Sequence, residues 1–269
     1  MGFFTPQIRL KFLENNKHQI YYLFSILFSL YALQCISLLK HMEKNSSNQN
    51  TYEYAHNDTS SPERESRTYA LNRFCFSEEI LNIRRGAFER GIPVSSDETL
   101  GFLDVCVKMA KPKKILEIGT AIGVSGITML FSCPSAHLTT IEVSEAFAYE
   151  ARDNFAKAHM QDRANVIVGD AAEVLPTLTD EYDFIFLDGP KVQYIKYLPH
   201  IKRLLSRGGT LFSDDILMYG WVNGEKPTPP KRRMLVQHIK EYLQVLTADN
   251  ELSTQIIDVG NGVALSIKK

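Results

Sequence analysis

Acidic residues follow short apolar stretches at four places in the second half of the chain. They are Glu142, Asp170, Asp188 and the pair Asp214-Asp215. The carboxyl ends of parallel strands meet at one edge of a sheet, where ligands bind. Asp188 and the Asp214-Asp215 pair follow strands that we expect to be neighbours, and three carboxylates repel one another unless a cation lies between them. Hard oxygen ligands of this kind suit Mg²⁺, so these three residues are predicted metal ligands.

A lysine lies close to the first of these acids. Lys191 comes three residues after Asp188, in the sequence DGPKVQY. A metal that binds the oxygens of a substrate lowers the pKa of a hydroxyl group and orients it for reaction. A lysine beside that second cation has a lowered pKa and can act as a general base. The alternative is a surface lysine that balances the acids, and both interpretations stay open.

A glycine-rich turn marks a second ligand-binding feature. The stretch from Lys113 to Gly126, KKILEIGTAIGVSG, predicts a strand, a tight turn and a helix. Its glycine spacing differs from the G-x-G-x-x-G pattern that places a pyrophosphate on a helix N-terminus. Glu117, two residues before Gly119, repels a pyrophosphate but suits a cation. S-adenosylmethionine (SAM) carries a sulfonium and an ammonium group, so we favour SAM over a dinucleotide.

Two of the acids extend this interpretation. Glu142 follows Gly119 by about twenty residues, the distance at which an acid on the next strand meets a ribose diol. Asp170, followed by Ala171, is placed to accept the adenine amino group. Each acid alone is more simply a solvated loop residue or a helix cap, but the set favours a SAM site.

Strands and helices alternate through this part of the chain, which predicts a parallel sheet covered by helices on both faces. The glycine-containing sequence Gly260-Asn261-Gly262 predicts a terminal hairpin. The pattern resembles the class I SAM-methyltransferase fold, an α/β, Rossmann-like, mostly parallel seven-stranded sheet with an antiparallel C-terminal hairpin strand. The predicted strands are Ile115–Ile118, His137–Val143, Asn165–Gly169, Asp183–Leu187, Thr210–Ser213, Thr254–Val259 and Val263–Lys268.

Helical patterns fill the spaces between these strands. We expect helices over Glu78–Arg90, Tyr194–Leu205 and Lys231–Leu246. Ser95 and Glu98 have the spacing of a capping box at the start of a further helix before the first strand.

The composition sets limits on function. The 269 residues carry a net charge of −1, so no global basic field indicates a nucleic-acid-binding protein and any such contact must be local. Cys35, Cys75, Cys106 and Cys133 form no C-x-x-C pair, which argues against a zinc or redox motif and suits a reduced, cytoplasmic compartment.

The N-terminal region divides by composition. After a mixed segment, 1–19, residues 20–39 form an uncharged apolar stretch just long enough to cross a bilayer as a helix. It is a membrane anchor, a signal peptide, or an extension translated upstream of a start at Met42. Residues 40–67 have the polar composition of a disordered linker. The catalytic domain is expected over 68–269, facing the cytosol where SAM is made.

The motifs ILEIGTAIG, DGPKVQY and SDDILMYG carry a family resemblance. From about Leu81 to Lys269 the chain resembles the cation-dependent O-methyltransferases that include the catechol and caffeoyl-CoA enzymes. Within them it is most similar to bacterial tRNA 5-hydroxyuridine methyltransferases. The resemblance implies SAM as donor, Mg²⁺ as metal and Lys191 as the catalytic lysine beside Asp188. The implied metal ligands are Asp188, Asp214 and Asp215, and the implied cofactor contacts are Ser95, Ser125, Glu142, Asp170, Ala171 and Asp188, with Glu117 and Gly119 added from the glycine turn.

The C-terminal sequence PPKRRMLVQHIKEY is similar to the tRNA-acting branch. Lys231, Arg232 and Arg233 would contact phosphates there, and the alternative is a helix N-terminus with a solvated basic face. The expected acceptor is 5-hydroxyuridine at the tRNA wobble position, with a small catechol or phenol as the alternative. A SAM-binding interaction protein without catalysis is a third possibility. We also expect a homodimer. Asp215 stands where the family usually has asparagine, which adds a negative charge to the metal site.

Overall fold

The protein is described by a computed structural model over residues 78–269. The predictions for the segment 1–19, the apolar stretch 20–39 and the linker 40–67 lie outside the described residues. Among the helices of the described part, none combines the length and the apolar character needed to cross a bilayer.

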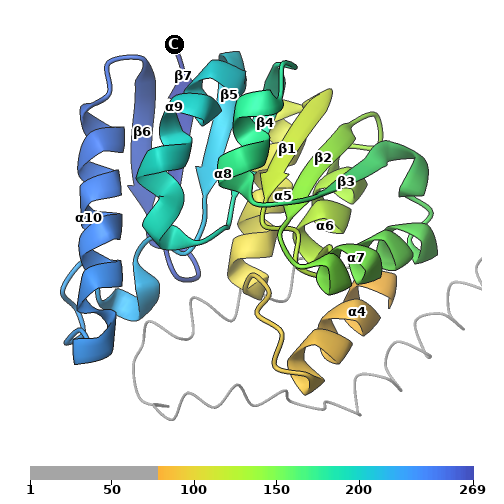
Figure 1. The fold of residues 1–269 in the computed structure, drawn as a ribbon, viewed down its shortest axis with the longest axis horizontal. Coiled ribbons are helices and arrows are strands. Elements are labelled where there is room, and N and C mark those ends of the chain that lie inside the picture. Colours follow the sequence, from red (N-terminus) through yellow and green to blue (C-terminus); the bar gives the residue numbers. More distant parts are fainter. Residues whose placement is uncertain (1–77) are drawn as a thin grey trace, which may run out of the picture. The chain divides into compact units, whose positions relative to one another are not determined.

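A seven-stranded sheet forms the centre of the described region (Figure 1). Its strand order is β3-β2-β1-β4-β5-β7-β6. The first five strands pair in parallel, and β7 runs antiparallel to both β5 and β6. This arrangement confirms the predicted fold class. The strands are β1 Lys114–Ile118, β2 His137–Glu142, β3 Ala164–Val168, β4 Tyr182–Leu187, β5 Leu205–Ser213, β6 Leu252–Ile257 and β7 Val263–Lys268.

Helices cover both faces of this sheet (Figure 1). Side chains of α4, α5, α6 and α7 share one buried apolar core, and those of α8, α9 and α10 share the other. The helices are α4 Glu78–Glu89, α5 Asp97–Ala110, α6 Val124–Ser132, α7 Glu145–Lys157, α8 Ala171–Val174, α9 Tyr194–Leu204 and α10 Arg233–Ala248. Short 3₁₀ helices lie at Gln161–Arg163, Leu175–Thr177, Lys191–Gln193, Met218–Gly220 and Pro230–Arg232.

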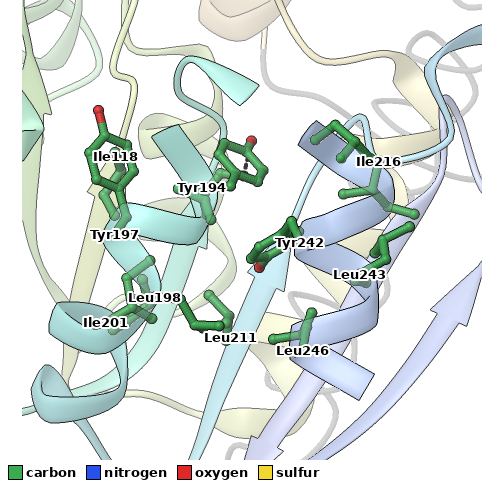
Figure 2. Close-up of a cluster of buried hydrophobic side chains, with 14 of the residues drawn as sticks. Ile118, Tyr194, Tyr197, Leu198, Ile201, Leu211, Ile216, Tyr242, Leu243 and Leu246 are labelled. Atoms are coloured by element: carbon green, nitrogen blue, oxygen red, sulfur yellow. Dashed lines mark hydrogen bonds between the residues drawn. The ribbon is translucent and has the colours of Figure 1, made fainter. Parts of the chain in front are cut away.

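The core under α9 and α10 supports the end of β5. Figure 2 shows side chains of the two helices converging, with the rings of Tyr194 and Tyr242 edge to face at 5.2 Å between centroids. Burying rings of this size removes a large apolar area from water, worth about 2 kcal/mol for each side chain. The Tyr242 hydroxyl also lies 2.7 Å from Ser213 Oγ in a hydrogen bond. This packing therefore fixes the last residue of β5, which directly precedes Asp214.

Two local predictions were wrong. The helix cap is Ser96 rather than Ser95, because Ser96 has extended backbone angles and its side chain accepts a hydrogen bond from Thr99 N at 3.2 Å. Strand β5 begins at Leu205, well before the predicted Thr210. The pairing of β5 with β4 shifts register, so β5 contains extra residues at this point. One of them is Gly208, which has a positive φ.

Candidate active site

A cavity of about 590 Å³ lies at the carboxyl ends of the parallel strands. It runs from the turn after β1 and the end of β2 to the ends of β4 and β5, as the rule for doubly wound sheets requires. Its lining includes most of the predicted site residues, namely Ser95, Gly119, Glu142, Asp170, Ala171, Asp188, Asp214 and Asp215. The acids that the sequence placed at strand ends therefore share one cavity.

The β2 end of the cavity carries two carboxylates held by backbone groups. Glu142 accepts hydrogen bonds from Ala121 N at 2.8 Å and from Ser144 N at 2.9 Å. Asp170 caps α8 by accepting from Ala172 N at 2.8 Å. These bonds come from N–H groups of the turn after β1 and of the starts of two helices. The backbone therefore fixes the orientation of both carboxylates. They retain free lone pairs for hydroxyl or amino donors.

Gly119 allows the turn after β1 to approach the end of β4. It has φ +99°, and an added Cβ would collide with the carbonyl oxygen of Asp188. Asp188 N in turn donates to Ile118 O at 2.9 Å. Both the backbone conformation and the lack of space for a Cβ therefore require glycine here. The glycine lets the turn after β1 lie against Asp188, the first predicted metal ligand.

Glu117 and Ser125 lie beneath the cavity rather than in its wall. Glu117 has no exposed surface, and its carboxylate accepts hydrogen bonds from Ser125 Oγ at 2.5 Å and Thr140 Oγ1 at 2.6 Å. Burial raises the pKa of Glu117 to about 7, the two hydrogen bonds oppose that rise, and the charges of Asp188 and Glu142 add to it. The structure thus places these two predicted cofactor residues below the site, bonded to each other.

The other end of the cavity is lined by the three aspartates, and Lys191 contacts two of them. Lys191 Nζ lies 2.7 Å from Asp188 Oδ1 and 3.9 Å from Asp215 Oδ2. The ammonium also donates to the Tyr194 hydroxyl at 2.8 Å, and that hydroxyl donates to Leu187 O at 3.0 Å. Lys191 is only 10% exposed, so it is part of the site and not a surface lysine.

The charges at this end shift several pKa values. Burial raises the pKa of Asp214 to about 7 and that of Asp215 to about 6, and Asp188 adds to both shifts while Lys191 opposes them. Burial by itself lowers the pKa of Lys191, but the surrounding charges, led by Asp188, raise it well above its usual range. The lowered lysine pKa predicted from the sequence requires a bound cation and stays a prediction, since the charges of the chain alone raise this pKa.

The donor set suits a hard cation in its chemistry. The carboxylates of Asp188 and Asp215 contact the Lys191 ammonium, Asp214 lines the same end, and Asp215 Oδ1 is buried without a hydrogen-bond partner among the described residues. An orphaned carboxylate oxygen of this kind is costly unless a cation or a donor meets it. Within residues 78–269, however, no three acidic, histidine or cysteine side chains are grouped closely enough to hold one ion.

Lys231, Arg232 and Arg233 do not reach the cavity. They are exposed and lie where a short 3₁₀ helix leads into α10. Arg233 contributes instead to a separate shallow depression with Lys240. The predicted phosphate contacts therefore form a surface feature apart from the aspartates.

Four side chains at the aspartate end of the cavity were not among the predicted site residues. Thr99 Oγ1 donates to Asp214 Oδ1 at 3.5 Å, and Gln193, Tyr219 and Asn261 line the same end. Tyr219 is 48% exposed, and its ring lies 5.2 Å from that of Trp221. The aromatic pair within SDDILMYGWV and the glutamine of DGPKVQY were usable signals, whereas Thr99 and Asn261 come from distant segments.

Comparison with known proteins identifies the family. The sequence model of a family described as O-methyltransferase matches residues 78–269. The chain is 30% identical over 183 residues to the tapetum-specific methyltransferase 1 of Arabidopsis thaliana, covering 66% of this chain and 77% of that protein. It is 31% identical over 193 residues to a catechol O-methyltransferase of Niastella koreensis, covering 67% and 86%.

Solved structures share the fold. The SAH-bound Podospora anserina methyltransferase PaMTH1 superposes with a TM-score of 0.70 at 24% identity, over 79% of this chain and 98% of that one. The chain thus belongs to the O-methyltransferase family of the caffeoyl-CoA and catechol type. The prediction of a SAM-dependent O-methyltransferase is confirmed at that level.

Proposed function

We propose that the protein transfers the methyl group of SAM to an ionised hydroxyl on a planar ring, with Mg²⁺ bound by the aspartates. One observation carries the proposal. A single cavity joins two backbone-held carboxylates at its β2 end to three aspartates at its β5 end, where Lys191 contacts Asp188. Such a cavity suits a donor and an acceptor bound side by side.

The donor occupies the β2 end. The free lone pairs of Glu142 accept the two ribose hydroxyls, and Asp170 accepts the adenine amino group. Gly119 lets the donor approach the backbone closely. Glu117 beneath the turn, once ionised above about pH 7, favours the cationic end of SAM without touching it.

The acceptor hydroxyl lies at the aspartate end, where it would pass its proton to Lys191, held as the neutral amine while a bound cation lowers its pKa. The oxygen then attacks the methyl carbon in line, the carbon–sulfur bond breaks, and its electron pair stays on sulfur to give S-adenosylhomocysteine. Lys191 stabilises the ionised oxygen with its ammonium. Its raised pKa means that it accepts a proton only when a second cation lowers that value. Asp188, Asp214 and Asp215 would hold Mg²⁺, and the ion would supply such a positive charge beside Lys191 and the acceptor.

A small catechol or phenol is the first acceptor of the proposal. Tyr219 offers an exposed ring at its mouth, against which a planar acceptor can stack. The catechol O-methyltransferase among the relatives supports this class.

Purified protein is incubated with SAM and catechol, and S-adenosylhomocysteine is measured with and without excess chelator. Asp214→Ala is compared with the exposed acid variant Asp180→Ala as control. Full activity in chelator, or in Asp214→Ala, would contradict the metal-assisted step.

The wobble-position 5-hydroxyuridine of tRNA is the second candidate. The exposed cluster of Lys231, Arg232 and Arg233 favours it, because such clusters contact phosphates. Mass spectrometry of tRNA nucleosides with and without the gene decides between the two. Unchanged 5-methoxyuridine in the deletion strain rules out the tRNA acceptor.

A further inference from the structure

The tip of the β6–β7 hairpin reaches the aspartate end of the cavity from the C-terminal end of the chain. Gly262 N donates to Val259 O at 2.9 Å, which closes a tight turn. Gly260 and Gly262 both have positive φ, +59° and +89°, on either side of Asn261. The turn therefore presents Asn261 to the cavity, which it lines.

Backbone groups of this tip hold the segment that follows Asp215. Asn261 O accepts hydrogen bonds from Leu217 N at 2.8 Å and Met218 N at 3.1 Å. Gly262 O accepts one from Ile216 N at 3.0 Å. Three consecutive N–H groups after the aspartate pair are thus satisfied by two neighbouring carbonyl groups of the hairpin.

The segment held in this way has an unfavourable backbone. Asp215, Met218 and Tyr219 all have positive φ, at 59°, 47° and 61°. Residues with side chains rarely adopt this conformation and do so only where surrounding contacts enforce it. The hairpin tip supplies these contacts, since its carbonyl groups bind the N–H groups between the strained residues.

The tip is also packed too closely to be moved aside. A Cβ added at Gly260 would collide with Ser96 and Thr99 in the first turn of α5, and one at Gly262 would collide with Leu217. The tip therefore packs between α5 and the segment that contains Leu217. Thr99 of α5 donates a hydrogen bond to Asp214, and the Leu217 segment directly follows Asp215.

We propose that Asn261 is a positioning residue for the acceptor end of the site. In this role its backbone carbonyl holds Leu217 and Met218, and its side-chain amide, which lines the same cavity as Asp215, is the donor available to the Asp215 carboxylate. Asn261 thereby sets the orientation of Asp215 and of the Tyr219 ring together. The effect of Asn261 on acceptor binding rests on the proposed function. Its effect on the conformation of residues 215–219 does not, and it can be measured without any acceptor.

The chain provides its own probe. Trp221 is the single tryptophan of the whole sequence, and its ring lies 5.2 Å from that of Tyr219. Acrylamide quenching of its fluorescence in the full-length protein therefore reports the state of this segment. Asn261→Ala removes the amide but leaves the backbone carbonyl. Asn261→Asp keeps the size and the turn preference but loses the donor when ionised. Asn250→Ala, in the turn at the other end of β6, is the matched control.

We expect the quenching constant of Trp221 to rise about twofold or more in both Asn261 variants and to stay unchanged in Asn250→Ala. The KM for catechol rises about tenfold, as loss of a hydrogen bond to a charged group predicts. The dissociation constant for SAM, measured by calorimetry, changes by less than about twofold because Glu142 and Asp170 are untouched.

A Trp221 quenching constant in Asn261→Asp equal to that of the wild type would overturn the proposal. The turn preference shared by Asn and Asp would then be sufficient to hold the segment without the amide. An equal loss of SAM and catechol affinity would also overturn it, since that indicates general misfolding. If the wild-type protein methylates neither catechol nor tRNA, the proposed function fails, while the quenching measurement still decides the role of Asn261. If Asn261→Ala does not fold, Asn261→Asp carries the same test.

Discussion

Replacing Glu117 by Gln should stabilise the protein at alkaline pH. Glu117 is fully buried in β1, where its carboxylate accepts hydrogen bonds from Ser125 and Thr140. Burial is the largest cause that raises its pKa, from 4.5 to about 7, and the nearby carboxylates of Asp188 and Glu142 add to it. Gln keeps the volume and the acceptor oxygen but carries no charge at any pH, so the variant isolates the cost of burying the charge.

The direction of the effect follows from proton binding. Between pH 4.5 and about 7 the folded protein keeps the Glu117 proton while the unfolded chain has lost it. The folded state binds more protons in this window, so raising the pH removes stability, and the loss is complete above about pH 7. Each pKa unit corresponds to about 1.4 kcal/mol, which gives about 3 kcal/mol at most. The amide of Gln bonds Ser125 or Thr140 less well, so we expect a net gain of about 2 kcal/mol at pH 8.

Thermal unfolding of both proteins between pH 4.5 and 8.5 measures this difference. A gain of about 2 kcal/mol corresponds to a Tm higher by roughly 4–8 °C at pH 8 for a domain of this size. At pH 4.5 the gain is absent. Glu173→Gln, which changes an exposed glutamate of α8, is the control and should show no such dependence. A Tm difference between Glu117→Gln and wild type that stays constant across this range would refute the assignment of a buried, pH-dependent charge.

Three further variants test other parts of the site. Lys191→Met should lower kcat by roughly a hundredfold while the dissociation constant for SAM stays within about threefold, because Lys191 lies at the acceptor end. Gly119→Ala should cost about 3 kcal/mol or prevent folding, measured by denaturant unfolding, since its Cβ meets the carbonyl group of the residue after β4 at a positive φ. Replacing Lys231, Arg232 and Arg233 together by Gln should weaken tRNA binding at least tenfold in a filter assay if tRNA is the acceptor, and should leave catechol methylation unchanged.

The parts of the fold that depend on local patterns were predictable from the sequence. The β1 strand, its glycine turn and α6 are contiguous, so apolar periodicity and glycine spacing determine them together. The positions of Glu142 and Asp170 follow, because each acid directly ends a strand or starts a helix. By contrast, Ser95 and Ser96 are both acceptable caps, and only the backbone angles of the folded chain choose between them.

The environment of a single buried charge was not predictable in the same way. Lys191 follows Asp188 by three residues, and this spacing shows that the two side chains meet. It does not show that Asp215 also faces the ammonium, or that Tyr194 bonds it. The pKa of Lys191 depends on all of these groups, so its direction of shift requires the folded structure.

The two ends of the cavity differ in how the chain builds them. The donor end is made by successive strand–turn–helix units, so its geometry is mostly local. The aspartate end depends on β7 pairing with β5, which places Ala264 opposite Ser213 and lays the hairpin tip over the residues after Asp215. Substitutions in the last strands can therefore alter the acceptor end while the donor end, built from β1 to β3, stays as it is. Acceptor preference is accordingly free to change within this fold with the SAM site retained.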